Sequence, residues 1–518
     1  MKSLTYRKIA SNVMISVMAQ VIYLCVSLLM NFILPRFIPE EQFAHWQLYI
    51  TYLSFVCIIN FGVFDGLMLR YSQYDYDELE KKRMRSQFQF VLFITTIAAV
   101  VFVLIACLCL EGTSRQLMIL IGIAMVTKNA GLYSSDTFQL TNRINRYALQ
   151  SIIQRVSYAA IVIVLICCRV ENFFWYCFSD ICGDVIAFCV AQFTNRRMYF
   201  GRGFISPREM ILETGRNIRA GAMLMLAVWS CTLTITAAKL VVQWCWGLSY
   251  FSNVALAFSV TNVFLNITTA VSNVLFPSLR RLKPETLPDM YGKIRQYISL
   301  VIFTVFILYY PGCWILEKWI PSYSSSLPYL GFLLPVVVFS VKRNMLANTY
   351  LKTYRKERMM FAINIFAGAI GIIAFVIIGK VFRNIYALLI AVDLSMLLSC
   401  VLSEIVVNKV IKGRILRDFI IDVIMSAGFI LITYYLSRWW ACLAYAGLLV
   451  LYFIVNCRFL IDVCKMTCRR LRSLFHRKPA ADSAAAGPCA SADNADTSSP
   501  AEDSTREEQD ADQGQDQQ

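Results

Sequence analysis

Several charged residues fall inside long apolar stretches of this sequence, where a charge is costly. A cation at the centre of a bilayer costs roughly 2.5 to 3.5 kcal/mol on insertion scales. Such side chains are therefore expected to face water, pair with an acid or reach the membrane surface. The cations are Lys128, Arg155, Lys342 and Arg343. The acids that could pair with them are Asp136, Asp180, Asp184, Asp393 and Glu404.

The spacing of these charges indicates what chemistry they can do. Asp180 and Asp184 are one helical turn apart, so both carboxylates lie on one face of a helix. With Asp136, they are candidates for binding a small cation that couples to the activity of the protein. The arginines and lysines are candidates for holding an anionic group, because a guanidinium clamps phosphate oxygens. A structural ion pair is the alternative reading for each of these residues.

A second candidate site is a polar stripe along an otherwise apolar helix near residues 250–278. The sequence "AVSNVLFPSLRRL" closes this helix with a proline and two arginines. At 100° per residue its polar side chains share a narrow arc, and lipid cannot satisfy their hydrogen bonds. They either bind neighbouring helices or line a cavity that accepts hydroxyl and phosphate groups. The stripe consists of Asn262, Asn266, Thr269, Asn273 and Arg280.

Composition shows which elements must position these residues. The chain has 518 residues and is 58% hydrophobic, well above the fraction found in soluble domains. Windows of about 20 apolar residues predict an all-α polytopic membrane protein with about fourteen transmembrane helices. The predicted helices are centred in 12–34, 46–69, 87–110, 117–140, 148–168, 172–194, 220–241, 250–278, 296–316, 327–351, 359–379, 384–407, 418–437 and 439–461.

Charge asymmetry predicts the orientation and the organisation of the chain. Most loop lysines and arginines follow even-numbered helices or lie at the termini, which places both termini in the cytoplasm. We expect a cell-membrane protein with two lobes of six helices each, two further helices and a tail. The predicted parts are 1–195, 196–219 (a basic linker), 220–410, 411–464, 465–478 (basic) and 479–518. The last part holds ten acidic residues and one arginine and is predicted to be disordered.

What the sequence lacks excludes several classes of protein. Its two histidines cannot build a multi-histidine metal site or a histidine-based catalytic triad, and no cofactor site is recognisable. No phosphate-binding GxxxxGK[ST] loop is present, and no loop between helices has room for a soluble catalytic domain. The "DYD" at 75–77 lies in a short charged loop and is read as a solvated surface. The sequence therefore predicts neither an enzyme nor a nucleic-acid-binding protein.

Several motifs together resemble a known family. They are "FGVFDGLMLRY" at 61–71, which carries Arg70, "VLFPSLRRL" at 274–282, the basic linker "NRRMYFGRGFISPREMILETGRNIR" and the extra C-terminal helix pair. Together they are similar to the Wzx-type polysaccharide flippases of the multidrug/oligosaccharidyl-lipid/polysaccharide exporter superfamily, over about residues 5–410. In the seventh helix the chain departs from that family's pattern, with Ala222 in place of a proline and Lys239 as the only charge.

This resemblance implies a fold of two six-helix lobes forming a V around a central cavity that opens alternately to each side. It also implies a lipid-linked oligosaccharide as substrate, moved without any change of bonds, with the bilayer and other polysaccharide-assembly proteins as partners. The sugar would contact the polar stripe. The residues expected to contact the diphosphate are Arg70, Arg155, Arg216, Arg219, Arg280, Lys342 and Arg343.

Three other functions stay open at this point. The first is a drug or metabolite exporter of the same superfamily, driven by Na⁺ or H⁺ through Asp136, Asp180 and Asp184. The second is a membrane polymerase or glycosyltransferase, for which the outer loops are short and nearly uncharged. The third is a non-transporting scaffold whose tail binds partners.

Overall fold

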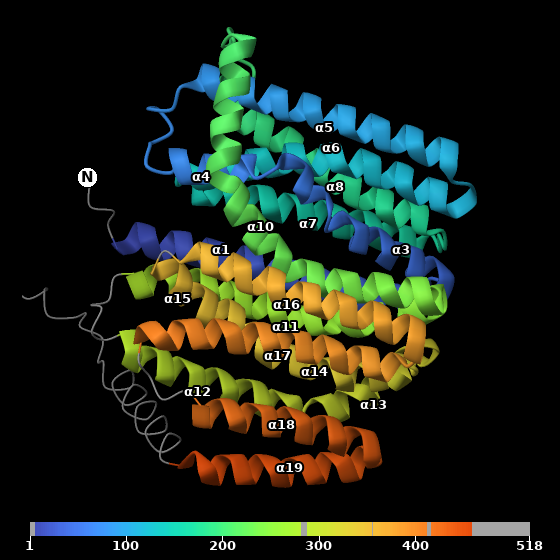
Figure 1. Ribbon diagram of the computed structural model, residues 1–518. Coiled ribbons are helices and arrows are strands. Elements are labelled where there is room, and N and C mark those ends of the chain that lie inside the picture. The colour runs from blue at the N-terminus through green and yellow to red at the C-terminus, as the bar shows by residue number, and fades with distance from the viewer. Residues whose placement is uncertain (1–5, 281–286, 355, 412–415, 458–518) are drawn as a thin grey trace, which may run out of the picture. The chain divides into compact units, whose positions relative to one another are not determined.

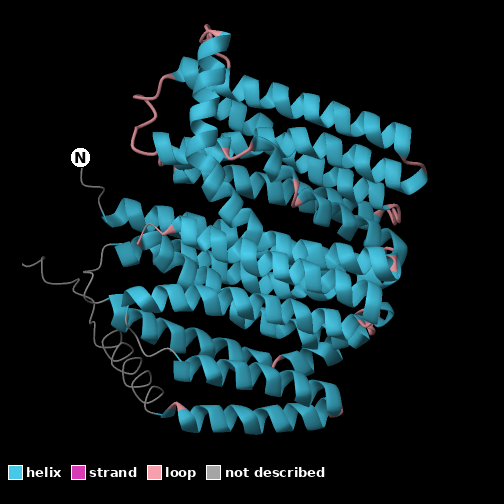
Figure 2. Cartoon of the chain, viewed as in Figure 1, coloured by secondary structure: helices cyan, strands magenta, loops and turns pink. Residues whose placement is uncertain are grey.

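The computed structural model describes residues 6–280, 287–354, 356–411 and 416–457, with the side chains of most of them. Within these ranges the chain is almost entirely helical and has no strand (Figure 2). Residues 1–454 form one compact unit, and the remainder belongs to a second unit. The predicted basic segment 465–478 and acidic tail 479–518 lie outside the described residues.

The helices follow one another with short connections. In chain order they are α1 Tyr6–Leu28, η1 Leu29–Ile33, α2 Leu34–Phe37, α3 Glu40–Leu53, η2 Val56–Asn60, α4 Val63–Tyr71, α5 Lys81–Cys109, α6 Gly112–Leu140, α7 Ile144–Cys167, α8 Phe173–Thr194, α9 Arg196–Tyr199, α10 Pro207–Trp246, α11 Leu248–Arg280, α12 Leu287–Phe306, α13 Tyr309–Trp319, η4 Pro321–Tyr323, α14 Ser326–Val341, η5 Lys342–Ala347, α15 Asn348–Thr353, α16 Glu357–Ile377, η6 Ile378–Phe382, α17 Ile385–Ile411, α18 Leu416–Tyr435 and α19 Arg438–Val455.

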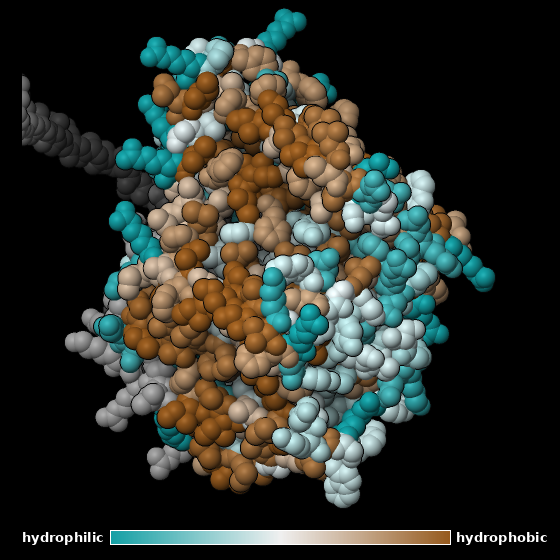
Figure 3. Space-filling view, turned by 45° about the vertical axis from the view of Figure 1, so that its right-hand side comes forward, coloured by the Kyte–Doolittle hydropathy of each residue, from teal (hydrophilic) through white to brown (hydrophobic). Residues whose placement is uncertain are grey.

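The number of membrane spans agrees with the sequence. In the described residues, 11 helices are long and apolar enough to cross a membrane, or up to 14 if each of three bent helix pairs is one span. The prediction of an all-α membrane protein with about fourteen spans is therefore confirmed. Figure 3 shows apolar side chains gathered in a broad area of one face, with hydrophilic ones along its margin, as expected of a surface that contacts lipid. The division into lobes at residues 195 and 220 stays a prediction.

The second span differs from the continuous helix that its hydropathy predicts. It bends by 56° between the stretch that ends at Asn60 and α4. Phe61 has φ 48° and Gly62 has φ 81°, and a left-handed residue ends a right-handed helix. The side-chain oxygen of Asn60 accepts a hydrogen bond of 3.0 Å from the backbone N–H of Gly62. This break lets α4 leave the direction of α3.

α4 then packs directly against α10, which carries the basic linker and continues into the seventh span. α10 bends by 48° near residue 231, and its first half crosses the ends of α5, α6 and α8 in Figure 1. A Cβ atom added at Gly66 of α4 would overlap the backbone of Asn217, and one added at Gly221 would overlap the backbone of Gly62 and Gly66. The two helices therefore touch through their backbones, which only glycine permits.

The remaining helices lie side by side (Figure 1). The helices α5 to α8 pack on one another, α1 contacts α7 and α11, and α11 contacts α3 and α14. α16 and α17 pack on each other and on α10, while α18 contacts α12 and α14. The hydroxyl of Tyr445 in α19 donates a 2.8 Å hydrogen bond to the carbonyl of Phe303 in α12. The last two helices are thus packed onto the rest of the unit.

Candidate functional site

Two of the predicted acids meet a cation at the centre of α6 and α8. Nζ of Lys128 in α6 lies 2.8 Å from Oδ2 of Asp180 and 2.8 Å from Oδ2 of Asp184, both in α8. The carboxylates are 7% and 5% exposed, whereas the lysine side chain is 24% exposed. The predicted placement of both acids on one helix face is thereby confirmed. In this conformation both are neutralised in part by one lysine.

Two further helices hold this ion cluster in place. The hydroxyl of Tyr49 in α3 donates a 3.2 Å hydrogen bond to Oδ2 of Asp180. The side-chain amide of Gln154 in α7 donates to Oδ1 of Asp184. Tyr49 is fully buried. Four helices therefore converge on one pair of carboxylates, which fixes their orientation.

A cavity of about 260 Å³ opens beside the cluster. Eight of the thirteen residues in its wall have polar or charged side chains, with amides and hydroxyls among them. Gln150, which is 7% exposed, donates from Nε2 to the carbonyl of Gly131, while its Oε1 has no hydrogen-bond partner among the described residues. One hydrogen-bonding atom of this wall residue is thus left without a partner in the described part of the protein. The cavity is lined by Leu53, Val56, Lys128, Asn129, Gly131, Leu132, Ser135, Gln150, Ser151, Gln154, Arg155, Asp184 and Ala187.

Arg155 brings a second cation to this cavity. It lies on α7, one residue after Gln154, and its guanidinium carbon is 4.5 Å from the ring centroid of Tyr23 in α1. The side chain is half-buried and forms no ion pair with any described residue. A guanidinium stacked on an aromatic face keeps its hydrogen-bond donors available at its edge. Arg155 is therefore suited to hold an anionic group in the cavity.

Two of the three predicted cations on α4 and α10 bind one carboxylate. Arg70 donates a 2.6 Å hydrogen bond to Oε1 of Glu213 and a second bond to the side-chain oxygen of Asn217. Arg216 pairs with Oε2 of Glu213 at 3.1 Å and is 69% exposed, and Arg219 is also exposed. Sequence analysis missed Glu213. The structure places this group outside the cavity of Arg155, at the α4–α10 contact.

Lys342 and Arg343 are both buried, and Lys342 belongs to a second ion cluster. Lys342 contacts the carboxylate of Asp422, and Nη1 of Arg343 donates a 3.2 Å hydrogen bond to Ser399. The centre of this cluster is Arg295, which sequence analysis missed. The carboxylates of Glu404 and Asp422, inside apolar helices, are the signal that a buried cationic partner was needed.

The polar stripe of α11 is described only in part. Asn262 and Asn266 are half-buried. Thr269, Asn273 and Arg280 belong to α11, but their side chains lie outside the described part of the structure. Asp136, near the end of α6, is half-buried and apart from the Lys128 cluster. The roles predicted for these six residues stay predictions.

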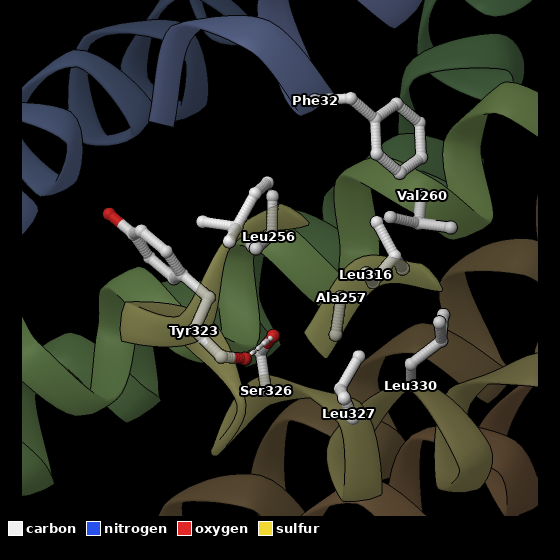
Figure 4. A pocket seen from close by; sticks show the side chains of 10 residues that line it. Phe32, Leu256, Ala257, Val260, Leu316, Tyr323, Ser326, Leu327 and Leu330 are labelled. Carbon is white, nitrogen blue, oxygen red and sulfur yellow. Dashed lines mark hydrogen bonds between the residues drawn. The ribbon is translucent and has the colours of Figure 1, made fainter. Parts of the chain in front are cut away.

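A further pocket is too small and too apolar to hold a polar substrate. Figure 4 shows its wall, in which Leu256, Ala257 and Val260 of α11 face Leu316 and Leu330. Its volume is about 20 Å³, close to the space of a single water molecule. The polar cavity beside Arg155 is therefore the better candidate.

The arrangement of these helices matches membrane transporters of known structure. An inward-facing multidrug transporter of the MATE family of the MOP superfamily aligns with a TM-score of 0.59 and 12% identity, over 77% of this chain and 98% of that one. The lipid II flippase MurJ, in an inward closed conformation, aligns with a TM-score of 0.63 and 11% identity, over 86% of this chain and 100% of that one. No curated protein sequence matches the chain. The chain thus shares its fold with these multi-pass membrane transporters.

The family follows from the sequence itself. Residues 9–283, more than half of the chain, match the model of the family described as polysaccharide biosynthesis protein. The chain belongs to this family. The predicted resemblance to polysaccharide flippases of the MOP superfamily is therefore confirmed at the level of family and fold.

Proposed function

We propose that this protein is a flippase that moves polyprenyl-diphosphate-linked oligosaccharide from the cytoplasmic to the outer leaflet, for cell-surface polysaccharide synthesis. Transport would proceed by alternating access, with no covalent chemistry. The observation that carries this proposal is the polar cavity within the membrane helices, which presents Arg155 without an acidic partner among the described residues. The family of polysaccharide biosynthesis proteins supports the same class of substrate.

The physical problem that such a protein solves is the transfer of a diphosphate and its sugars through hydrocarbon. Burying unpaired charge costs many kcal/mol, and each unsatisfied hydroxyl adds to the cost. We assign Arg155 to the diphosphate, because its donors can replace the water around phosphate oxygens. The side chains of Asn129, Gln150 and Gln154 would replace water around the sugar hydroxyls. The prenyl chain would stay in lipid.

The other predicted residues take supporting roles in this proposal. Asn262, Asn266, Thr269 and Asn273 of α11 would contact the sugar, and Arg280 would meet the diphosphate at the cytoplasmic edge. Arg70, Arg216 and Arg219 would attract the substrate at the α4–α10 contact. Lys342 and Arg343 are buried elsewhere, so they would reach substrate only in another conformation of the transport cycle.

The alternative is a cation-coupled exporter of drugs or metabolites. It requires acidic residues that are free to take up a cation. In the described conformation Asp180 and Asp184 are both bound to Lys128, which favours the flippase over the exporter. Export of a cationic dye by the purified protein, with no movement of lipid-linked saccharide, would instead support the exporter.

The test is a flipping assay in proteoliposomes with lipid-linked oligosaccharide from the native host. A membrane-impermeant reagent that modifies the sugar reports the leaflet. Arg155→Ala should lower the rate at least about tenfold, since a hydrogen bond to a charged group contributes roughly 1.5 to 3 kcal/mol. Arg155→Lys should keep part of the activity.

Arg146→Ala is the matched control, because it removes the same charge from the same helix outside the cavity. Its rate should equal that of the wild type. Equal rates for Arg155→Ala and Arg146→Ala would reject the assignment of Arg155 to the substrate.

A further inference from the structure

We propose that Lys128 is a built-in counter-cation, whose ammonium fills a monovalent-cation site formed by Asp180 and Asp184, so that the protein binds no Na⁺ there. This inference rests on the transport function proposed above, since an internal counter-cation matters only to a cavity that binds and releases a substrate. It also goes further, because it states that this site needs no coupling Na⁺. The lysine would thereby replace an ion that would otherwise have to bind from solution.

The position of the ammonium carries the proposal. Nζ of Lys128 lies at the same distance, 2.8 Å, from one oxygen of each carboxylate. It is therefore placed between the two acids rather than paired with one of them. A positive charge at this point neutralises both carboxylates in part. A bound cation would occupy the same position.

The surroundings of the two acids are suited to a small hard cation. Such ions are bound by oxygen ligands from carboxylates, amides and water. The two carboxylates supply such oxygens, and the hydroxyl of Tyr49 and the side-chain N–H of Gln154 hold them in place by donating hydrogen bonds to them. An independent observation is the Oε1 atom of Gln150, which lies in the buried cavity wall with no partner among the described residues.

Removal of the lysine charge would leave an uncompensated site. Asp180 and Asp184 are both nearly buried, and the effective penalty for an isolated buried ion is several kcal/mol. A Lys128→Met variant keeps a similar chain length but no charge. It should therefore take up Na⁺ from solution, with the cavity of about 260 Å³ providing room for the ion and its water.

The experiment compares Na⁺ binding and thermal unfolding of the full chain in detergent, in NaCl and in choline chloride at equal ionic strength. Wild-type protein should bind no ²²Na⁺ and should unfold at the same temperature in both salts. Lys128→Met should bind about one ²²Na⁺ and gain about 3 °C in NaCl, because a ligand that binds only the folded state stabilises it.

Two controls separate this effect from a general loss of a buried lysine. Lys239 is 7% exposed and lies 5.5 Å from the ring centroid of Phe258, with no acid beside it among the described residues. Lys239→Met should therefore show no response to Na⁺. Adding Asp180→Asn and Asp184→Asn to the Lys128→Met variant should abolish the response.

Several outcomes would overturn the inference. They are saturable ²²Na⁺ binding by the wild type that the two Asp→Asn changes abolish, and a Lys128→Met variant that responds to pH alone. If Lys128→Met does not fold, saturable ²²Na⁺ binding by the wild type would still overturn the inference. None of these readouts requires substrate, so a negative flipping assay would reject the proposed function and leave this result interpretable.

Discussion

Arg295 is the residue whose replacement should destabilise the protein most clearly. It belongs to α12, and its side chain is 1% exposed and binds acids of α17 and α18. Nε and Nη2 donate to the two oxygens of Glu404 at 2.9 and 3.0 Å, and Nη2 also donates to Asp422 at 3.1 Å. Arg295→Ala would leave Glu404 and Asp422, both buried, against the single positive charge of Lys342.

The size of the expected destabilisation follows from this imbalance of charge. Removing one partner of a buried ion pair costs about 3 to 5 kcal/mol, because the other charge stays buried without compensation. The matched surface pair is Arg438 with Glu317, which are 2.5 Å apart but 31% and 47% exposed. An exposed ion pair contributes at most about 1 kcal/mol, so Arg438→Ala should have a small effect.

The assay is unfolding of the purified full chain in mixed micelles of rising denaturing-detergent content, followed by its intrinsic fluorescence. A double variant, Arg295→Met with Glu404→Met, removes one charge of each sign and leaves Lys342 with Asp422. It should recover much of the loss seen in Arg295→Ala. The reasoning is refuted if Arg295→Ala and Arg438→Ala have the same effect, or if the double variant is less stable than Arg295→Ala.

Three further predictions concern the contacts around the site. Gly66→Leu should disrupt the α4–α10 contact and lower both stability and transport. Gly215→Ala should be tolerated, because a Cβ atom added there meets open space. Unfolding curves of the two variants check this difference. Glu213→Gln should weaken the bond of this side chain to Arg70 and separate α4 from α10. The rate of disulfide cross-linking between cysteines introduced on the two helices should therefore decrease. Tyr49→Phe removes one hydrogen-bond donor to Asp180 and should lower the free energy of unfolding by about 1 kcal/mol. An unchanged unfolding curve would contradict this prediction.

Hydropathy predicted the spans well because a bilayer imposes one length on every helix. It did not predict the break in the second span, which depends on the left-handed conformation of Phe61 and Gly62 and on the close approach of α10. It also did not predict that α10 would continue from the basic linker into the seventh span as one element. Both features depend on contacts between helices far apart in the sequence, which periodicity does not contain.

The charged residues were found from sequence more easily than their partners. Asp180 and Asp184 were predicted to share a helix face, and the structure adds that Lys128 binds both. Arg295 was missed because it lies within the first turns of α12, where a cation is expected to reach the membrane surface. Its burial follows only from the packing of α18 against α12.

Whether an intramembrane cation has a carboxylate partner decides what it indicates about the substrate. Lys128, Arg295 and Lys342 are each paired with carboxylates, so their charge is neutralised within the protein. Arg155, Lys239 and Arg343 have no such match among the described residues, and of these three only Arg155 lines the polar cavity. A positive net charge therefore says little about an anionic substrate. An arginine that has no acidic partner in the described part of the chain and shares a cavity wall with three amide side chains is a specific reason to test one.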